Sequence, residues 1–211
     1  MMTIRQILNY YKNQPLLLRV YVVLRLIIVD LHKVLSYLPR NVNSVMEVAC
    51  GYGMNSFLLA SLYKGKKILC YDIDSRRINL LKSINPHANL EFHLKDASLL
   101  ESFDADAILM VDFLHHIPYD QQRILLTKIH KTAPENVTII IKDMDKGRYS
   151  IRQLCNYLID IIHTGDFRFF YHDKKSFIDL FKSCNFKINK MDYINRAFIP
   201  LNHILFSLGK N

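Results

Sequence analysis

The sequence predicts an α/β domain with a doubly wound, mostly parallel sheet. Two observations predict this fold class. Apolar segments of strand length alternate with segments of helix length along most of the chain, which is the pattern of consecutive strand–helix–strand units. In addition, the first strand ends in a turn with two glycines, Gly51 and Gly53, and a helix pattern follows at once. Phosphate- and nucleoside-binding α/β domains open in this way.

The predicted elements follow in regular order. Strands are expected at residues 44–49, 67–72, 89–93, 106–111 and 137–142, and helices at about 54–63, 75–83, 119–132, 149–163 and 173–183. Two further strands are expected at the end of the chain, at Phe186–Tyr193 and His203–Leu208. The domain itself spans residues 39–211, with residues 144–172 as an insertion, and residues 1–38 form a helical extension ahead of it.

Size and composition are those of one globular domain. The chain has 211 residues, of which 50% are hydrophobic and 22% charged, enough for a substantial core. Its four cysteines have no paired spacing, which argues against a zinc site and a disulfide framework. The start of the chain carries no secretory-signal pattern. We therefore expect a protein of the cytoplasm, either free or peripheral at a membrane.

The net charge of +9 leaves two interpretations open. One is an ordinary solvated basic surface, and the other is an anionic partner, either a membrane surface or a substrate. No RNA-binding motif accompanies the charge, so nucleic acid is not expected as a partner.

A long apolar run lies at Leu16–Leu31 and is interrupted by Arg19, Arg25 and Asp30. It is too short and too charged to span a membrane comfortably. Its broad apolar face predicts a helix packed on the sheet or over the site. A basic membrane-surface helix and a dimer contact are the alternatives.

The stretch Val45–Asn55 carries the clearest chemical signal. An acid, Glu47, sits four residues before Gly51, and the third glycine of a dinucleotide-binding turn is missing. A carboxylate there would repel a pyrophosphate and suits a cationic or hydroxyl-bearing ligand.

This stretch resembles the first motif of class I S-adenosylmethionine-dependent methyltransferases, an acid followed by Gly-x-Gly-x-Gly. Glu47 matches the acid, Gly51 and Gly53 match the second and third glycines, and Ala49 stands at the first. The resemblance covers roughly residues 40 to 211. It implies a three-layer, Rossmann-like fold whose sheet has seven strands, the last one antiparallel, and it implies S-adenosylmethionine as cofactor.

The next two strands end in matching acids. Asp72 comes 19 positions after Gly53, where nucleoside-binding domains place an acid that accepts hydrogen bonds from ribose hydroxyls. The resemblance assigns Asp72 and the adjacent Ile73 to the ribose side of the cofactor, and Asp96 and Ala97 to the adenine ring. For Asp72 the alternative is a helix N-cap, but Asp74 already fills that position; for Asp96 the alternative is an Asp that only forms a turn.

The fourth strand ends in Asp112, followed by His115 and His116, and is similar to the Leu-His-His ending in small-molecule methyltransferases. Asp112 is expected beside the cofactor. An imidazole would serve as a general base near neutral pH; His116 is the first candidate, and His115 or Asp143 the next. A histidine that only packs beside the cofactor is the alternative. No metal is predicted, because His115 replaces the second acid of the metal-binding version of this motif.

Other motifs near the end of the chain are less specific. The fifth strand delivers Lys142, Asp143 and Asp145 to the same edge of the sheet, either to contact substrate or to pair with neighbours. Asn185 stands where the family usually has a glycine that ends a helix in the left-handed conformation.

Together these motifs predict transfer of the methyl group of S-adenosylmethionine, in line, to a small or lipid-like molecule. Residues 1–38 and 144–172 are expected to cover the site and to select the acceptor. A non-catalytic S-adenosylmethionine-binding partner subunit is the first alternative. A nucleotide-cofactor oxidoreductase is the second, against which Glu47 and the missing glycine argue. The motifs specify neither the acceptor nor the oligomeric state.

Overall fold

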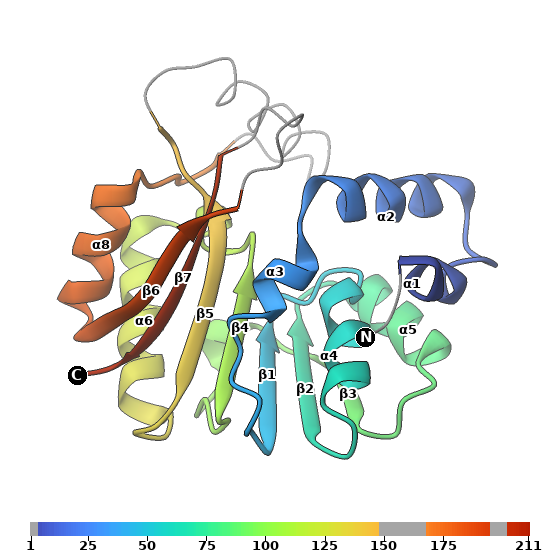
Figure 1. The fold of residues 1–211 in the computed structure, drawn as a ribbon, viewed down its shortest axis with the longest axis horizontal. Coiled ribbons are helices and arrows are strands. Elements are labelled where there is room, and N and C mark those ends of the chain that lie inside the picture. Colours follow the sequence, from blue (N-terminus) through green and yellow to red (C-terminus); the bar gives the residue numbers. More distant parts are fainter. Residues whose placement is uncertain (1–3, 148–167, 195–201) are drawn as a thin grey trace.

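The computed structural model describes residues 4–147, 168–194 and 202–211 (Figure 1). They form one seven-stranded sheet in the order β3-β2-β1-β4-β5-β7-β6. The strands are β1 (Ser44–Val48), β2 (Lys67–Asp72), β3 (Leu90–Leu94), β4 (Ala107–Val111), β5 (Thr138–Met144), β6 (Phe186–Tyr193) and β7 (His203–Lys210).

The first five strands are parallel, and β7 is antiparallel to both β5 and β6. The predicted sheet, with seven strands and an antiparallel last one, is therefore confirmed. The strand order reverses at β1, which lies between β2 and β4. In open α/β sheets the ligand crevice forms at such a switch point, beyond the carboxyl ends of the strands.

The helices agree with the sequence pattern to within a residue. They are α4 (Met54–Leu62), α5 (Ser75–Ile84), α6 (Tyr119–Thr132) and α8 (Lys174–Ser183), preceded by α1 (Ile4–Tyr10), α2 (Leu16–Ile28) and α3 (Leu31–Leu35). Two short 3-10 turns, η1 (Ala97–Leu99) and η2 (Leu114–His116), follow β3 and β4. The helix expected at 149–163 lies outside the described residues.

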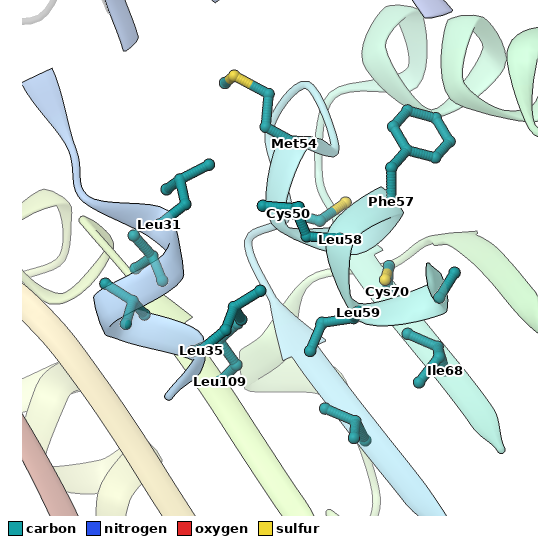
Figure 2. Packing of buried hydrophobic residues seen from close by; sticks show 14 of the residues in the cluster. Leu31, Leu35, Cys50, Met54, Phe57, Leu58, Leu59, Ile68, Cys70 and Leu109 are labelled. Atoms are coloured by element: carbon teal, nitrogen blue, oxygen red, sulfur yellow. The ribbon is translucent and has the colours of Figure 1, made fainter. Parts of the chain in front are cut away.

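Two apolar layers, one on each face of the sheet, form the core. On one face, side chains of α3, α4 and α5 pack with residues of β1 and β2, including Leu35, Phe57 and Ile68 (Figure 2). On the other face, α6 and α8 cover the sheet through residues such as Leu126 and Phe181. All five residues of β4 are buried, as expected for a central strand covered on both faces. The arrangement is the predicted three-layer domain.

The N-terminal helices are attached to the domain rather than extended from it. Helix α1 packs against α2 and α4, and the Tyr10 ring stacks on Phe57 with ring centres 4.4 Å apart. Helix α2 lies above the carboxyl edge of the sheet (Figure 1), with Val22 and Leu26 buried beneath it. Among the described helices, none is long and apolar enough to cross a membrane.

The turn after β1 reverses the chain through three left-handed residues. Ala49, Gly51 and Gly53 have φ angles of 58°, 57° and 75°. A Cβ at Gly53 would lie 2.5 Å from Cδ2 of Leu81, so only glycine fits there. Ala49 takes the same backbone region with a side chain, which costs roughly 1–2 kcal/mol. A further left-handed residue, Asn185 with a φ of 64°, ends α8 as the sequence predicts.

Glu47 stabilises this turn through hydrogen bonds on the sheet face that α4 covers. Its register partner on β2 is Cys70, so both side chains point to the sheet face that α4 covers. There the buried Glu47 carboxylate accepts hydrogen bonds from the hydroxyl of Ser56, on α4, and from the Cys70 thiol. Burial raises the pKa of Glu47 to about 7, despite the opposing effect of these hydrogen bonds. The side chain ties β1 to the first turn of α4.

The strain at Ala49 generates the first prediction. Replacing Ala49 by Gly removes the left-handed penalty of roughly 1–2 kcal/mol and adds chain entropy to the unfolded state worth roughly 0.4–1 kcal/mol. We expect the free energy of unfolding to rise by about 0.5–1 kcal/mol in urea denaturation. Ala60→Gly, inside α4, is the control and should destabilise the protein. A less stable A49G protein would contradict the account of the turn.

Glu47 generates a second prediction, on pH. A carboxyl whose pKa is about 7 when folded, against 4.5 as its ordinary value, binds more protons in the folded than in the unfolded state between these values. Its contribution to stability is therefore complete below about pH 4.5 and is lost as the pH rises to about 7, a change of up to about 3 kcal/mol.

The variant Glu47→Gln should flatten this part of the stability profile, measured by urea denaturation at a series of pH values. Glu101→Gln, at an exposed position after η1, is the matched control and should leave the profile unchanged. Parallel profiles for wild type and E47Q would contradict a raised pKa of Glu47 in the folded state, because they would show that folding does not change the protons bound at this position.

Candidate functional site

A cavity of about 420 Å³ lies at the switch point of the sheet, beyond the carboxyl ends of β1, β2 and β4. Its volume is within the range of roughly 300–1,000 Å³ that small-molecule sites occupy. Most of the predicted site residues line it: Ala49, Gly51, Asp72, Ile73, Asp96, Ala97, Asp112 and His116. Residues that are far apart in the sequence therefore meet at one place.

Asp72 connects the end of β2 to the turn after β1. One oxygen of its buried carboxylate accepts a hydrogen bond from the Gly51 amide at 2.7 Å, and the other accepts one from the Asp74 amide at 2.9 Å. As the sequence predicts, the residue that caps α5 is Asp74 rather than Asp72. A carboxylate offers about four acceptor positions, so Asp72 keeps acceptor capacity toward the cavity.

The end of β3 forms a second polar wall. Asp96 accepts a hydrogen bond from the Ser98 amide at 2.8 Å and so begins the 3-10 turn η1. This is the turn-forming role that the sequence left as an alternative, and it places both Asp96 and Ala97 at the cavity. Ile73, 73% exposed, lies at the cavity on the side of β2.

Two predicted cofactor contacts lie outside the cavity wall. Neither Glu47 nor Gly53 is among the lining residues. The Glu47 side chain is directed to the face under α4, and Gly53 is the residue at which the turn meets α4. The structure thus places both residues behind the turn, where they shape it.

A buried charge cluster closes the cavity on the side of β4 and β5. The carboxylate of Asp112 forms ion pairs with Arg25 of α2 and Lys142 of β5. Burial opposes ionisation of Asp112, but Arg25 and Lys142 outweigh it and hold its pKa well below its ordinary value. Of the two roles left open for Lys142, the structure shows pairing with a neighbour. Through Arg25, the same cluster fixes α2 over the cavity.

Of the three candidate bases, two are buried behind the cavity and one lines it. His115 and Asp143 are fully buried and hydrogen-bonded through the imidazole Nδ1 and the carboxylate, and neither lines the cavity. His116 does line it, with its ring centre 4.0 Å from that of His115. Direct contact of His115 or Asp143 with substrate is therefore not supported, because β5 and η2 enclose this pair behind His116.

Several cavity residues were not predicted. Tyr21, Arg25 and Leu31 come from the N-terminal segment, Tyr52 and Lys95 come from the turns after β1 and β3, and Arg77 comes from the first turn of α5. The Arg77 guanidinium lies over the Tyr52 ring at 5.1 Å. No motif marks these side chains, although Tyr52 and Lys95 lie directly beside residues that were predicted. Among the residues that the structure describes, no group of three or more potential metal ligands occurs.

Comparison with known proteins supports the assignment of the fold. Residues 46–137 match the model of a family described as a methyltransferase domain. No curated protein matches the sequence. Among solved structures, the chain is similar to mitomycin 7-O-methyltransferase, with a TM-score of 0.72 and 13% identity over 100% of this chain and 61% of that one.

Two further structures contain the cofactor or its product. Human N-acetylserotonin methyltransferase in complex with S-adenosylmethionine has a TM-score of 0.69 and 17% identity over 99% of this chain and 57% of that one. Magnesium protoporphyrin IX methyltransferase from Synechocystis with bound S-adenosylhomocysteine has a TM-score of 0.68 and 15% identity over 96% and 91%.

The chain spans less than two thirds of the length of the mitomycin and N-acetylserotonin proteins. At these identities the likeness shows the fold. Residues 46–137 match the methyltransferase-domain model, and the described chain has the fold of these solved methyltransferases.

Proposed function

We propose that this protein transfers the methyl group of S-adenosylmethionine to a small or lipid-like acceptor. The observation that carries the proposal is the meeting of the glycine turn, Asp72 and Asp96 around one cavity at the switch point of the sheet. The family match over residues 46–137 supports the same cofactor. The bound cofactor would supply a methyl group already activated on a positively charged sulfur.

The cavity residues fit this cofactor in the order of the strands. The left-handed turn at Ala49 and Gly51 exposes backbone at the amino end of α4 and leaves room for the methionine part. Asp72 would accept hydrogen bonds from the ribose hydroxyls, and Asp96 and the Ala97 amide would hold the adenine ring. Because these residues come from the ends of three different strands, together they would hold the cofactor in one orientation. Positioning of this kind lowers much of the barrier to a displacement in line.

His116 is the residue we assign as general base for an acceptor whose nucleophile carries a proton. It is the one candidate base that reaches the cavity. Behind it, Asp143 binds the His115 imidazole, and the His115 ring stacks on Tyr171 with ring centres 5.1 Å apart. This buried pair positions His116 by packing against its ring, rather than by contact with the acceptor.

The acceptor side of the cavity is aromatic and apolar, with one basic group. Tyr21, Phe113 and Ile117 line it beside Arg25. The Phe169 ring lies 5.6 Å from His116, so the described end of the 144–172 insertion reaches the site. This contact supports the predicted role of the insertion as a lid, although residues 148–167 lie outside the described chain. The structural relatives named for small aromatic or macrocyclic substrates favour an acceptor of that size.

Cofactor binding generates the third prediction. Calorimetric titration of the folded protein with S-adenosylhomocysteine should show one site, and NAD, tested in parallel, should show none. Asp72→Asn leaves one backbone amide without an acceptor and removes the charge, so its Kd should rise roughly 10- to 100-fold, since a hydrogen bond to a charged group is worth roughly 1.5–3 kcal/mol.

Asp104→Asn, at an exposed position, is the matched control and should bind like the wild type. Binding of NAD in place of S-adenosylhomocysteine would favour the oxidoreductase alternative. Binding of S-adenosylhomocysteine without turnover on any acceptor would favour the non-catalytic partner subunit.

The base generates the fourth prediction. Incubation of a cell extract with isotopically labelled S-adenosylmethionine should identify the acceptor as the molecule that gains label. With that acceptor, His116→Ala should lower kcat roughly 10²- to 10⁴-fold if the nucleophile loses a proton, and added imidazole should restore part of the rate.

His130→Ala, on α6, controls for loss of a histidine elsewhere. An unchanged kcat for H116A on an oxygen acceptor would remove His116 from the role of base.

A further inference from the structure

Helix α2 has an unusual distribution of apolar residues. Of its 13 residues, LLLRVYVVLRLII, only two are charged and both are arginines. A helix that is apolar on all sides is normally enclosed on all sides. Here the domain covers one side only, through buried residues such as Val22 and Leu26. Within residues 4–147, 168–194 and 202–211, no element covers the opposite side, which is an apolar surface.

The exposed residues of α2 form one stripe. Leu16, Val20, Leu24 and Ile27 recur at intervals of three or four, which is the spacing of one helix face, and they are 46% to 69% exposed. Leu17 and Val23 widen the stripe, and Ile4 of α1 is also exposed. Half of the large exposed apolar side chains in the described chain lie on these two helices. A contiguous apolar patch of this kind marks an interaction surface.

The charges around the stripe are of one sign. Arg5, Lys12 and Arg19 are exposed and line, with Leu16 and Val20, a cavity of about 930 Å³ between α1 and α2. Residues 1–29 contain no Asp or Glu. Among the described residues, no carboxylate lies within ion-pair distance of these three cations. The partner of the surface should therefore be both apolar and anionic.

We propose that this face of α1 and α2 docks on an anionic membrane surface, with the α2 stripe among the acyl chains and the three cations at lipid headgroups. At 13 residues, α2 is too short to span a bilayer, which needs roughly 20 residues, but it suits a helix lying in the interface. A second copy of the chain is disfavoured as occupant, because it would bring three like charges against three.

The position of α2 gives this docking a consequence. Its inner side contributes Tyr21 and Arg25 to the cavity at the switch point, while its outer side carries the stripe. This consequence rests on the proposed function: in the docked protein, the acceptor side of that cavity would lie beside the lipid phase. This deepens the proposal of a lipid-like acceptor, which would then reach His116 along α2.

Co-sedimentation with vesicles tests the docking directly. The whole chain should sediment with vesicles of phosphatidylglycerol and phosphatidylcholine and stay in solution with phosphatidylcholine alone, and 0.5 M NaCl should weaken the binding. Leu24→Asp should lower the partition coefficient at least tenfold. Ile124→Asp, on α6, is the matched control, because Leu24 and Ile124 are 51% and 57% exposed. Lys12→Gln and Arg19→Gln should each lower it about fivefold, which corresponds to about 1 kcal/mol per basic residue.

Other outcomes separate the alternatives. Equal sedimentation of L24D and I124D would overturn the proposal, and so would a dimer in analytical ultracentrifugation that L24D dissociates while vesicles bind neither form. Titration of L24D with S-adenosylhomocysteine keeps the two proposals distinct, because Leu24 lies outside the cofactor cavity. Vesicle binding without cofactor binding would defeat the proposed function alone, and cofactor binding without vesicle binding would defeat the docking alone.

Discussion

The conformation of the turn after β1 determines the shape of the cavity at the switch point of the sheet. Three left-handed residues within five positions form this turn. Three contacts fix it: the Asp72 carboxylate of β2 accepts a hydrogen bond from the turn, the Ser56 hydroxyl donates to Glu47, and the Tyr11 hydroxyl of the N-terminal segment donates to the Tyr52 carbonyl. A strained turn persists only where its surroundings determine it. The space that this turn leaves at the switch point is the cavity in which we propose that S-adenosylmethionine binds.

A second constraint connects the N-terminal helices to the chemistry. Asp112, itself left-handed with a φ of 51°, binds Lys142 of β5 and Arg25 of α2. Arg25 is one of the two cations that balance the buried Asp112 carboxylate, and its ion pair with Asp112 holds α2 over the cavity. The same helix therefore lines the cavity with one side and carries the exposed apolar stripe on the other, which is why the two proposals share one element.

The sequence predicted the features that depend on the order of strands and motifs along the chain. Strand ends recur along the chain, so Gly51, Asp72, Asp96 and Asp112 could be placed on one edge of a sheet from chain order alone. The depth of a side chain depends instead on its partners across the sheet. Glu47 is directed under α4 with Cys70, and η2 buries His115 while exposing His116 to the cavity. The pairing of Arg25 with Asp112, which are 87 residues apart, has no local signal.

Hydrogen–deuterium exchange with and without S-adenosylhomocysteine tests the central claim most directly, because it locates the ligand along the chain. The account predicts slower exchange in the turn at 49–55, at 71–75 after β2 and at 95–99 after β3, with little change in β6 and in the exposed face of α2. Protection confined to α1 and α2, around the larger cavity, would contradict it. So would saturation with the ligand that leaves the turn after β1 exchanging at its original rate.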